Sequence, residues 1–240
     1  EDGLKIQDAI GYGPQGDNLS IGRSPNGIGP WTLNKPTPGT SNKNISLGSI
    51  DSLSINEWMA RPVNGSDWFE IYNRSSLPIL LEGLRISDDP TQPGKTIMPP
   101  LSFIQGKGFL KFIADNSPNE GINHSSFRLS GKGEVILLTN INDKIIDSVL
   151  FSEQTRGISE GRYPDGDKTI INFPNTSTPG QSNLIIDDTD DDGLPNLWET
   201  LYGLNPNDFS DANLDNDNDG HNNLEEFIAG TNPNDKFSIL

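Results

Sequence analysis

Short runs in which apolar and polar residues alternate, with turn residues between them, fill the middle of the chain. Alternation with a period of two places successive side chains on opposite faces of a β-strand. No long helical pattern interrupts these runs, so the segment predicts an antiparallel β-sandwich. The predicted strands are Leu53 to Ala60, Asp67 to Asn73, Pro78 to Ser87, Gly108 to Ala114, Gly133 to Thr139 and Ile145 to Phe151.

The pattern changes after residue 184, where apolar residues recur at helical spacing in two segments offset by 27 residues. Each segment predicts a two-turn helix with one apolar face. A glycine follows each helix, Gly203 and Gly230, and an Asn-Pro pair stands just beyond it. Glycine permits a left-handed helix end, and proline forbids continuation. The apolar positions are Leu197, Trp198, Leu201 and Tyr202 in the first copy, and Leu224, Phe227 and Ile228 in the second.

Acidic residues alternate in the loop before each helix, at the spacing of a calcium loop. Ca²⁺ takes six to eight hard oxygen ligands, which alternate carboxylates, one backbone carbonyl and a bidentate Glu on the following helix supply. Gly193 and Gly220 permit the sharp bend at loop position 6. The predicted ligands are Asp188, Asp190, Asp192, Leu194 (carbonyl), Asn196 and Glu199 in the first loop, and Asp215, Asp217, Asp219, His221 (carbonyl), Asn223 and Glu226 in the second.

Neither loop has room or pattern for an entering helix, so these are loop-plus-exit-helix units. The segment resembles bacterial thrombospondin type 3-like calcium repeats, and dockerin repeats have related geometry. It differs from a paired EF-hand at loop position 8, where Pro195 and Asn222 replace an aliphatic residue. Two alternatives stay open: a merely solvated acidic tail, and further cations between the loops at the spare carboxylates of Asp208 and Asp211.

Charge is concentrated in the same segment. Residues 184–240 contain 14 Asp and Glu against one Lys, a net charge of −13 within a total of −17. Such loops repel themselves without metal, so we expect folding to be coupled to Ca²⁺ binding. Extracellular modules bind calcium with Kd values of about 10⁻⁴ to 10⁻³ M. Because calcium is permanently present outside the cell, this favours a structural role over a sensor role. The negative charge argues against unaided nucleic-acid binding.

The sandwich segment resembles a bacterial lamin tail domain over residues 49–183, and that resemblance implies an immunoglobulin-like fold. The opening motifs are Leu53-Ser-Ile-Asn-Glu-Trp-Met-Ala60, Asp67-Trp-Phe-Glu-Ile-Tyr-Asn73 and Leu81-Glu-Gly-Leu-Arg-Ile-Ser-Asp-Asp89. The closing motifs are Ile145-Ile-Asp-Ser-Val149, Gly161-Arg-Tyr-Pro-Asp-Gly166 and Thr178-Pro-Gly-Gln-Ser-Asn183.

The closing motifs also occur near the start of the chain, 139 to 141 residues earlier. Residues 1–45 therefore resemble the end of a preceding lamin tail domain, and we expect them to pack on their neighbour or to be a remnant of a longer protein. The predicted domains are 1–45, 46–184 (the sandwich) and 185–240 (the calcium module). The earlier copies are Ile6-Gln-Asp-Ala-Ile10, Gly22-Arg-Ser-Pro-Asn-Gly27 and Thr37-Pro-Gly-Thr-Ser-Asn42.

Catalytic patterns are sparse. His124 has serine neighbours, but no nucleophile elbow occurs, and His221 lies in a calcium loop. Asp67 and Glu70 are three residues apart on a predicted strand and point to opposite faces, so structural hydrogen bonds or solvation explain Glu57, Asp67 and Glu70 better than glycoside hydrolysis. Trp31, Trp58 and Trp68 are interpreted as packing residues, with a sugar-stacking platform as the alternative.

These observations predict a non-enzymatic, calcium-binding structural or adhesive segment of a larger bacterial protein, secreted or at the cell surface. The chain lacks Cys and any apolar run long enough to span a membrane. Its expected partners are calcium ions, neighbouring domains of a longer parent chain, and surface polysaccharide or protein. Two alternatives remain: an accessory substrate- or surface-binding region of an extracellular hydrolase (a nuclease or carbohydrate-active enzyme), and a dockerin-like module that recruits a partner. We expect any targeting segment to lie upstream.

Overall fold

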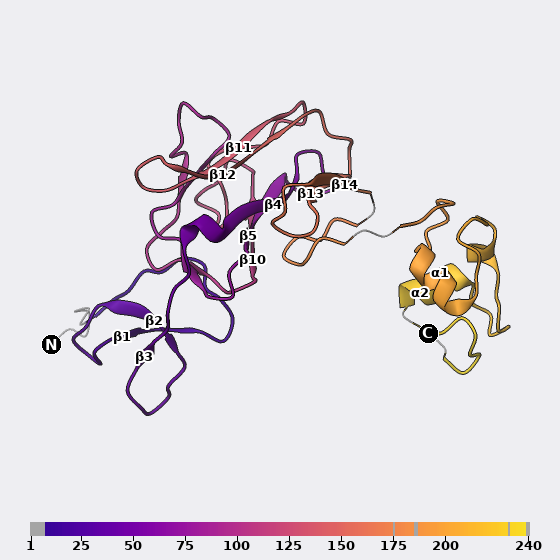
Figure 1. Ribbon diagram of the computed structural model, residues 1–240, viewed down its shortest axis with the longest axis horizontal. Helices are drawn as coiled ribbons and strands as arrows, with labels where there is room; N and C mark the ends of the chain where they lie inside the picture. The colour runs from indigo at the N-terminus through magenta and orange to yellow at the C-terminus, as the bar shows by residue number, and fades with distance from the viewer. Residues whose placement is uncertain (1–7, 175, 185–186, 230, 239–240) are drawn as a thin grey trace, which may run out of the picture. The chain divides into compact units, whose positions relative to one another are not determined.

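The chain forms two compact units, Glu1–Leu184 and Ile185–Leu240. The computed structural model describes residues 8–174, 176–184, 187–229 and 231–238 (Figure 1). The predictions that involve Ile6 and Gly230 lie outside the described residues.

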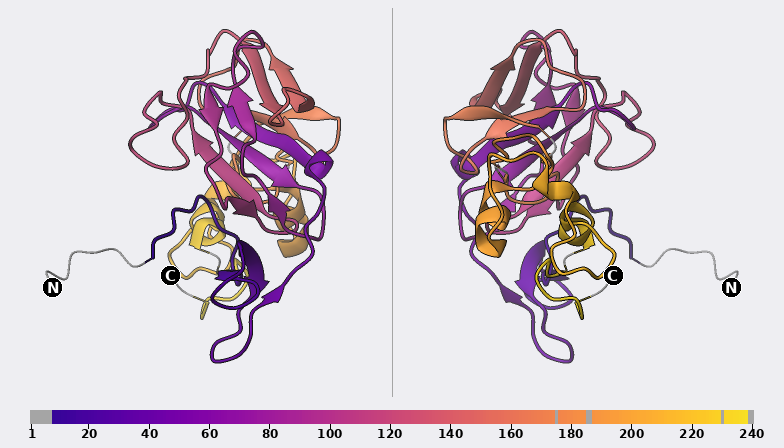
Figure 2. Two further views of the ribbon diagram at one scale, coloured as in Figure 1. Left: turned by 90° about the vertical axis from the view of Figure 1, so that its left-hand side faces the viewer. Right: turned by 90° about the vertical axis from the view of Figure 1, so that its right-hand side faces the viewer.

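The first unit is built around two antiparallel sheets that share one core (Figures 1 and 2). A short 3-10 turn, Ile50–Ser52, precedes the first sandwich strand, and a small sheet pairs β6 (Ile79–Leu80) with β9 (Phe103–Ile104). The five-stranded sheet has the order β10 (Phe109–Ile113), β5 (Trp68–Asn73), β4 (Leu53–Met59), β13 (Ser159–Arg162) and β14 (Ile170–Phe173). The four-stranded sheet has the order β12 (Ile145–Phe151), β11 (Glu134–Thr139), β7 (Arg85–Ser87) and β8 (Thr96–Ile97).

Aromatic side chains fill the core between these sheets. The ring of Phe69 stacks on Phe112 and Phe127, with centroid distances of 5.1 and 5.8 Å. Trp58 is fully buried and its ring centroid lies 6.1 Å from that of Phe151, which belongs to the other sheet. Close packing of this kind removes apolar surface from water and holds the layers together. The predicted mainly β, sandwich fold is therefore confirmed.

Two details of the strand prediction differ from the structure. The run Pro78 to Ser87 is not one strand, because a turn at Gly83 (φ 75°) divides it into β6 and β7, which belong to different sheets. The sandwich strands β8, β9, β13 and β14 lie outside the predicted runs. Strand β13 (Ser-Glu-Gly-Arg) has no apolar side chains that could alternate, and a Cβ atom on its Gly161 would lie 2.6 Å from the carbonyl oxygen of Asn56 on β4.

The N-terminal segment forms a separate three-stranded sheet within the first unit. Its order is β1 (Ser20–Arg23), β2 (Trp31–Lys35) and β3 (Lys43–Asn44). Main-chain hydrogen bonds join the preceding segment to the sandwich: Gly13 donates to the carbonyl of Pro100 over 3.0 Å, and Phe103 donates to that of Pro14 over 2.8 Å. Residues 8–45 therefore pack against the sandwich through specific contacts.

This sheet reproduces the hydrogen bonds of the closing strands β13 and β14. The Arg23 guanidinium contacts the Asp8 carboxylate as Arg162 contacts Asp147. The amide of Asn42 donates to the Arg23 carbonyl, and that of Asn183 donates to the Arg162 carbonyl, both over 2.8 Å. The repeated sequence motifs thus form a repeated local structure.

The second unit contains two seven-residue helices, α1 (Asn196–Tyr202) and α2 (Asn223–Ala229), and the 3-10 turn η2 (Asp211–Asn213). The Trp198 ring packs against Tyr202 and Phe227, with centroid distances of 4.8 and 5.5 Å. Gly203 ends α1 in the left-handed conformation, with φ 78°. The predicted helices and this terminator are confirmed.

The expected single apolar face is wrong at one position of each helix. Leu201 is 72% exposed and Ile228 is 76% exposed. These residues are 27 positions apart, so they are equivalent in the repeat. A helix of two turns has room for only a narrow inward-facing stripe, which the half-buried Trp198 and Phe227 occupy.

Candidate metal centre

The first acidic loop, residues 188–199, is organised by its own main-chain N–H groups. Asp188 accepts hydrogen bonds from Asp192 N over 3.3 Å and from Gly193 N over 2.9 Å. Asp192 accepts one from Leu194 N over 2.8 Å. Gly193 has φ 95°, a conformation that side chains disfavour. The chain is thereby bent so that its alternate carboxylates converge.

The second loop, residues 215–226, repeats these contacts. Asp215 accepts from Gly220 N over 3.0 Å, and Asp219 accepts from His221 N over 2.9 Å. Gly220 has φ 102°. Sequence repetition at an offset of 27 therefore corresponds to repetition of backbone geometry.

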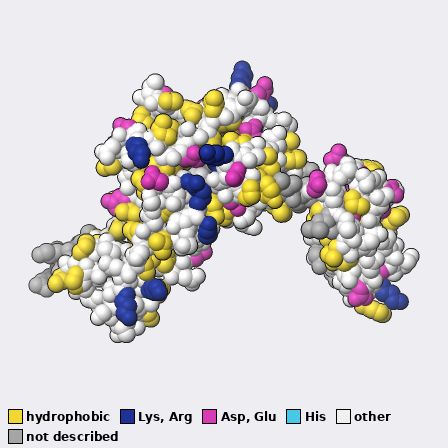
Figure 3. All heavy atoms as spheres, viewed as in Figure 1, with side chains coloured by type: hydrophobic (Ala, Val, Ile, Leu, Met, Phe, Trp, Pro, Cys, Tyr) yellow, Lys and Arg dark blue, Asp and Glu magenta, His cyan; other side chains and the backbone are white. Residues whose placement is uncertain are grey.

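Three carboxylates converge in each loop. The oxygens of Asp188, Asp190 and Asp192 lie within 4.8 Å of one another, and so do those of Asp215, Asp217 and Asp219. Figure 3 shows acidic side chains on the visible face of this unit. Carboxylates this close repel one another unless protons or cations neutralise them.

The Glu at loop position 12 is fully buried in both copies. Both carboxylate oxygens of Glu199 are buried without a hydrogen-bond partner, and so is Oε2 of Glu226. Further buried oxygens without a partner belong to the loops: both of Asp190, and one each of Asp192, Asp217 and Asp219. Burial of an ionised carboxylate is very costly unless it is paired or coordinates a metal. The donor set is all oxygen, which suits a hard cation such as Ca²⁺.

Burial and neighbouring carboxylates raise the pKa values of both position-12 glutamates. Burial, with the nearby carboxylates of Asp190, Asp192 and Asp211 adding to it, raises the pKa of Glu199 to about 7. Burial also raises the pKa of Glu226, next to Asp217 and Asp219. Each site thus disfavours negative charge in the absence of a bound cation.

The two predicted asparagine ligands differ in their contacts. The Asn196 side chain accepts from Thr189 N over 2.9 Å and donates to the Thr189 hydroxyl over 2.7 Å. The Asn223 side chain is fully buried, and its Oδ1 has no hydrogen-bond partner. The structure therefore leaves the Asn223 oxygen free for a cation and engages that of Asn196 within the loop. Leu194 and His221 occupy position 7, and their N–H groups bind the Asp side chain two residues earlier.

The structure adds one residue to the first site. The carboxylate oxygens of Asp192, Glu199 and Asp211 lie within 4.8 Å of one another. Asp211 belongs to the 3-10 turn η2, outside the loop, and is buried. Loop spacing alone could not assign it to the site, and its acidic character was the only signal in the sequence. Asp208, the other spare carboxylate, binds the hydroxyl of Ser210 and is exposed.

A second group of possible ligands lies in the sandwich. Asp115, Glu120 and His124 converge, and His124 Nδ1 lies 2.7 Å from Asp115 Oδ2. Ser125 donates its hydroxyl to the Phe127 carbonyl rather than to His124. The arrangement is an Asp–His pair in a turn, and it lacks the serine contact that a catalytic triad requires.

Buried acids in the sandwich serve as hydrogen-bond acceptors. Glu57 accepts from the Ser159 hydroxyl over 2.5 Å and from Thr178 N over 3.1 Å. Glu70 accepts from the Asn56 amide over 2.9 Å and from Gly180 N over 2.7 Å. These two glutamates fix the Thr-Pro-Gly turn, so the structural interpretation of them is confirmed.

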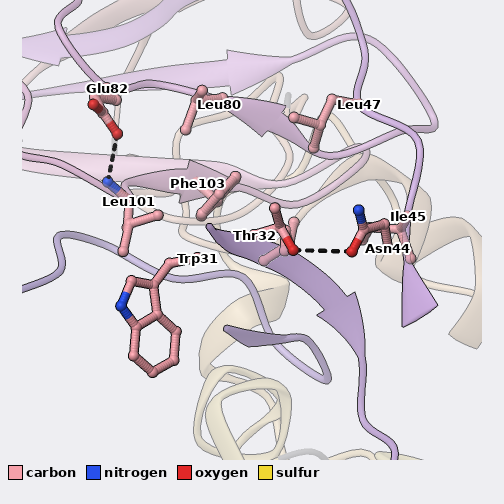
Figure 4. A pocket seen from close by; sticks show the side chains of 10 residues that line it. Trp31, Thr32, Asn44, Ile45, Leu47, Leu80, Glu82, Leu101 and Phe103 are labelled. Carbon is pink, nitrogen blue, oxygen red and sulfur yellow. Dashed lines mark hydrogen bonds between the residues drawn. The ribbon is translucent and has the colours of Figure 1, made fainter. Parts of the chain in front are cut away.

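The tryptophans do not form a platform for sugar stacking. Trp58 is fully buried and Trp68 is 5% exposed, so two of the three proposed rings pack in the protein. Trp31 instead lines a cavity of about 250 Å³ with Leu33, Leu80, Leu101 and Phe103 (Figure 4). The only acid among its lining residues, Glu82, accepts a hydrogen bond from Leu101 N.

No protein-family model matches the chain, and no curated protein matches it either. No helix among the described residues is long and apolar enough to cross a membrane. Inference about the function of the chain therefore rests on its fold and on the acidic loops.

Proposed function

We propose that residues 185–240 form a calcium-binding module with two sites, and that the chain is a non-enzymatic structural or adhesive segment of a larger bacterial protein, secreted or at the cell surface. In this proposal the sandwich resembles a lamin tail domain, and the module resembles thrombospondin type 3-like repeats. Calcium is bound by the aspartates of each loop, by the carbonyls of Leu194 and His221, and by Glu199 and Glu226. Asn223 adds its amide oxygen.

The observation that carries the proposal is the set of buried carboxylate oxygens without protein partners. Glu199 and Glu226 are fully buried, and three aspartate carboxylates converge in each of their loops. Native proteins pair buried charges or use them to bind metals. The position-12 glutamate also links each loop to the start of its helix, so cation binding would stabilise both.

A structural role follows from the size of the unit. A module of fewer than 60 residues buries little apolar surface and commonly depends on a metal or disulfides for stability. The chain has no Cys. Calcium binding and folding would then be one process, and extracellular calcium would keep the module permanently stiff.

Calorimetric titration of Ca²⁺ into the chelator-stripped whole chain tests this function. We expect two sites with Kd values of about 10⁻⁴ to 10⁻³ M or tighter. The double variant Glu199→Gln and Glu226→Gln should abolish both sites, whereas the charge-matched control Asp208→Asn with Asp235→Asn should retain them. Absence of binding at millimolar calcium would refute the function.

One observation favours a second function, recruitment of a protein partner as in dockerins. Leu201 and Ile228 are exposed at equivalent positions of the two helices. Apolar residues that stay exposed on paired helices provide a recognition surface, since their burial by a partner is favourable.

Surface plasmon resonance against a panel of cohesin-type domains tests this second function. Calcium-dependent binding that Leu201→Asp weakens and Leu77→Asp does not would support it, since Leu77 is an exposed leucine in the other unit. Absence of binding by every member of the panel would count against it.

A further inference from the structure

The two repeats of the calcium module differ at one position that bears on the metal. Asp211 Oδ2 accepts a hydrogen bond from Asn205 N over 2.8 Å. At the equivalent position in the second repeat, Ser238 Oγ accepts from Asn232 N over 3.1 Å. The local turn is thus the same, but only the first repeat has a carboxylate there.

The other oxygen of this carboxylate faces the first site. Asp211 is 5% exposed, and its Oδ1 is buried without a hydrogen-bond partner. Its carboxylate lies within 4.8 Å of oxygens of Asp192 and Glu199, and Glu199 has no protein partner for either oxygen. An aspartate anchored through one oxygen and open at the other is positioned to coordinate a cation.

The main chain of the same residue contacts the second site. The Asn223 amide donates to the Asp211 carbonyl over 2.7 Å, while its Oδ1 is buried and free of protein partners. The Asp211 carbonyl therefore orients the side-chain amide of Asn223, a predicted ligand of the second loop, and leaves its Oδ1 available to a cation. The first loop also approaches α2 directly, because a Cβ atom on Gly193 would lie 3.2 Å from Leu224.

We propose that Asp211 is an additional ligand of the first calcium site and couples the two sites. The inference rests on the proposed calcium function and deepens it. The first site has five carboxylates and the second has four, so the first binds calcium more tightly. Occupation of the first site fixes η2, which fixes the Asn223 oxygen and thereby raises the affinity of the second site. Such coupling is reciprocal.

The variant Asp211→Asn tests this inference in the whole chain, with Asp208→Asn as the control. The control removes the same charge from an exposed residue three positions away in the same turn. Binding at each loop is followed through the NMR signals of the Gly193 and Gly220 amides, each of which donates to the first aspartate of its own loop. We expect about 10- to 100-fold weaker binding at the first loop, the range for loss of residues that support a metal site. Binding at the second loop should weaken several-fold, and the control should leave both unchanged.

The reciprocal variant Ser238→Asp guards against a misfolded Asp211→Asn protein. It places a carboxylate at the equivalent position of the second repeat. We expect severalfold tighter calcium binding at the second loop, followed through the Gly220 amide signal. If Asp211→Asn leaves the calcium affinity of both loops unchanged, the assignment of Asp211 as a ligand is overturned. If it weakens binding at the first loop only, the coupling between the two sites is overturned. Failure of the unsubstituted protein to bind calcium would instead refute the proposed function, so the two failures are distinguishable.

Discussion

Two pairs of fully buried glutamates, one pair in each unit, differ in what surrounds them. In the sandwich, Glu57 and Glu70 receive hydrogen bonds from hydroxyl, amide and main-chain donors. In the second unit, Glu199 receives none on its side chain, and Glu226 has one buried oxygen without a partner. Equally buried carboxylates are thus stabilised in two ways: by hydrogen-bond donors of the protein in the sandwich and, we infer, by a bound cation in the loops.

The difference shows that burial alone does not identify a metal site. A buried carboxylate with protein donors is a structural acceptor that holds a turn in place. A buried carboxylate next to other carboxylates, and without donors, needs an external cation. The two units should therefore respond differently to calcium removal, to substitution of their glutamates and to pH.

Calcium removal should affect only one unit. With excess chelator we expect the amides of residues 187–238 to lose protection from hydrogen exchange, because the repelling carboxylates lose their counter-ion. The amides of the sandwich strands should keep their protection. A free calcium concentration of 100 times the Kd adds about 2.7 kcal/mol per site to the free energy of unfolding. Equal loss of protection in both units would contradict the contrast.

Substitution of a satisfied glutamate should destabilise the sandwich with or without calcium. Glu57→Ala removes the acceptor of the Ser159 hydroxyl and of Thr178 N and leaves both donors without a partner in the interior. We expect a loss of roughly 3 kcal/mol in the free energy of unfolding of the first unit. Urea denaturation followed by tryptophan fluorescence measures it, and Glu153→Ala, at an exposed position, is the control.

The stability of the first unit should fall as pH rises. Burial, assisted by the charges of Glu57 and Asp165, raises the pKa of Glu70 from 4.5 to about 8. Because the folded state favours the protonated form, the stabilisation is complete below pH 4.5 and is lost as pH rises to about 8. Burial raises the pKa of Asp67 from 3.8 to about 6, with the same sign.

We expect a decrease on the order of 1 to 3 kcal/mol between pH 5 and pH 8 in unfolding experiments. Glu70→Gln cannot titrate and should flatten this dependence. A stability that is constant or rises over this interval would show that Glu70 is ionised throughout.

Substitution of a buried glutamate in the metal-free second unit should be stabilising, in contrast to the destabilising Glu57→Ala in the sandwich. Glu199→Gln removes a buried charge beside Asp190, Asp192 and Asp211, so it should stabilise the calcium-free protein by about 1 kcal/mol. The variant should also lose the first calcium site. Because the calcium-free module is largely unfolded in this account, its helical circular dichroism in chelator measures the gain, and a helix content no greater than that of the unsubstituted protein would oppose it.

Much of the fold follows from the sequence because the local signals agree. The predicted runs contain β4, β5, β10, β11 and β12, although both faces of β4 and β5 are buried, and the glycine after α1 ends that helix as predicted. Strand β13 was not predictable because it has no apolar side chain, and its Gly161 fits the close approach of β4. Such a tertiary requirement leaves no periodic pattern.

The candidate site was predictable to the extent that it is local. Ligand spacing within a loop is a property of consecutive residues, so the acidic positions could be assigned from the repeat alone. Asp211 reaches the first site from a separate 3-10 turn, and its contact with Glu199 depends on how that turn packs. The hydrogen bonds between Asn196 and Thr189 likewise depend on side-chain conformation, which the spacing of residues does not specify.

The most direct test is a calcium titration of the stripped whole chain, followed by the amide NMR signals of Glu199, Glu226, Glu57 and Glu70. Our account predicts that the Glu199 and Glu226 signals move and saturate at two ions per chain, while those of Glu57 and Glu70 stay fixed. Signals that remain unchanged at several millimolar calcium, or that move equally in both units, would contradict the claim that a cation supplies what the protein lacks around the buried acids of the second unit.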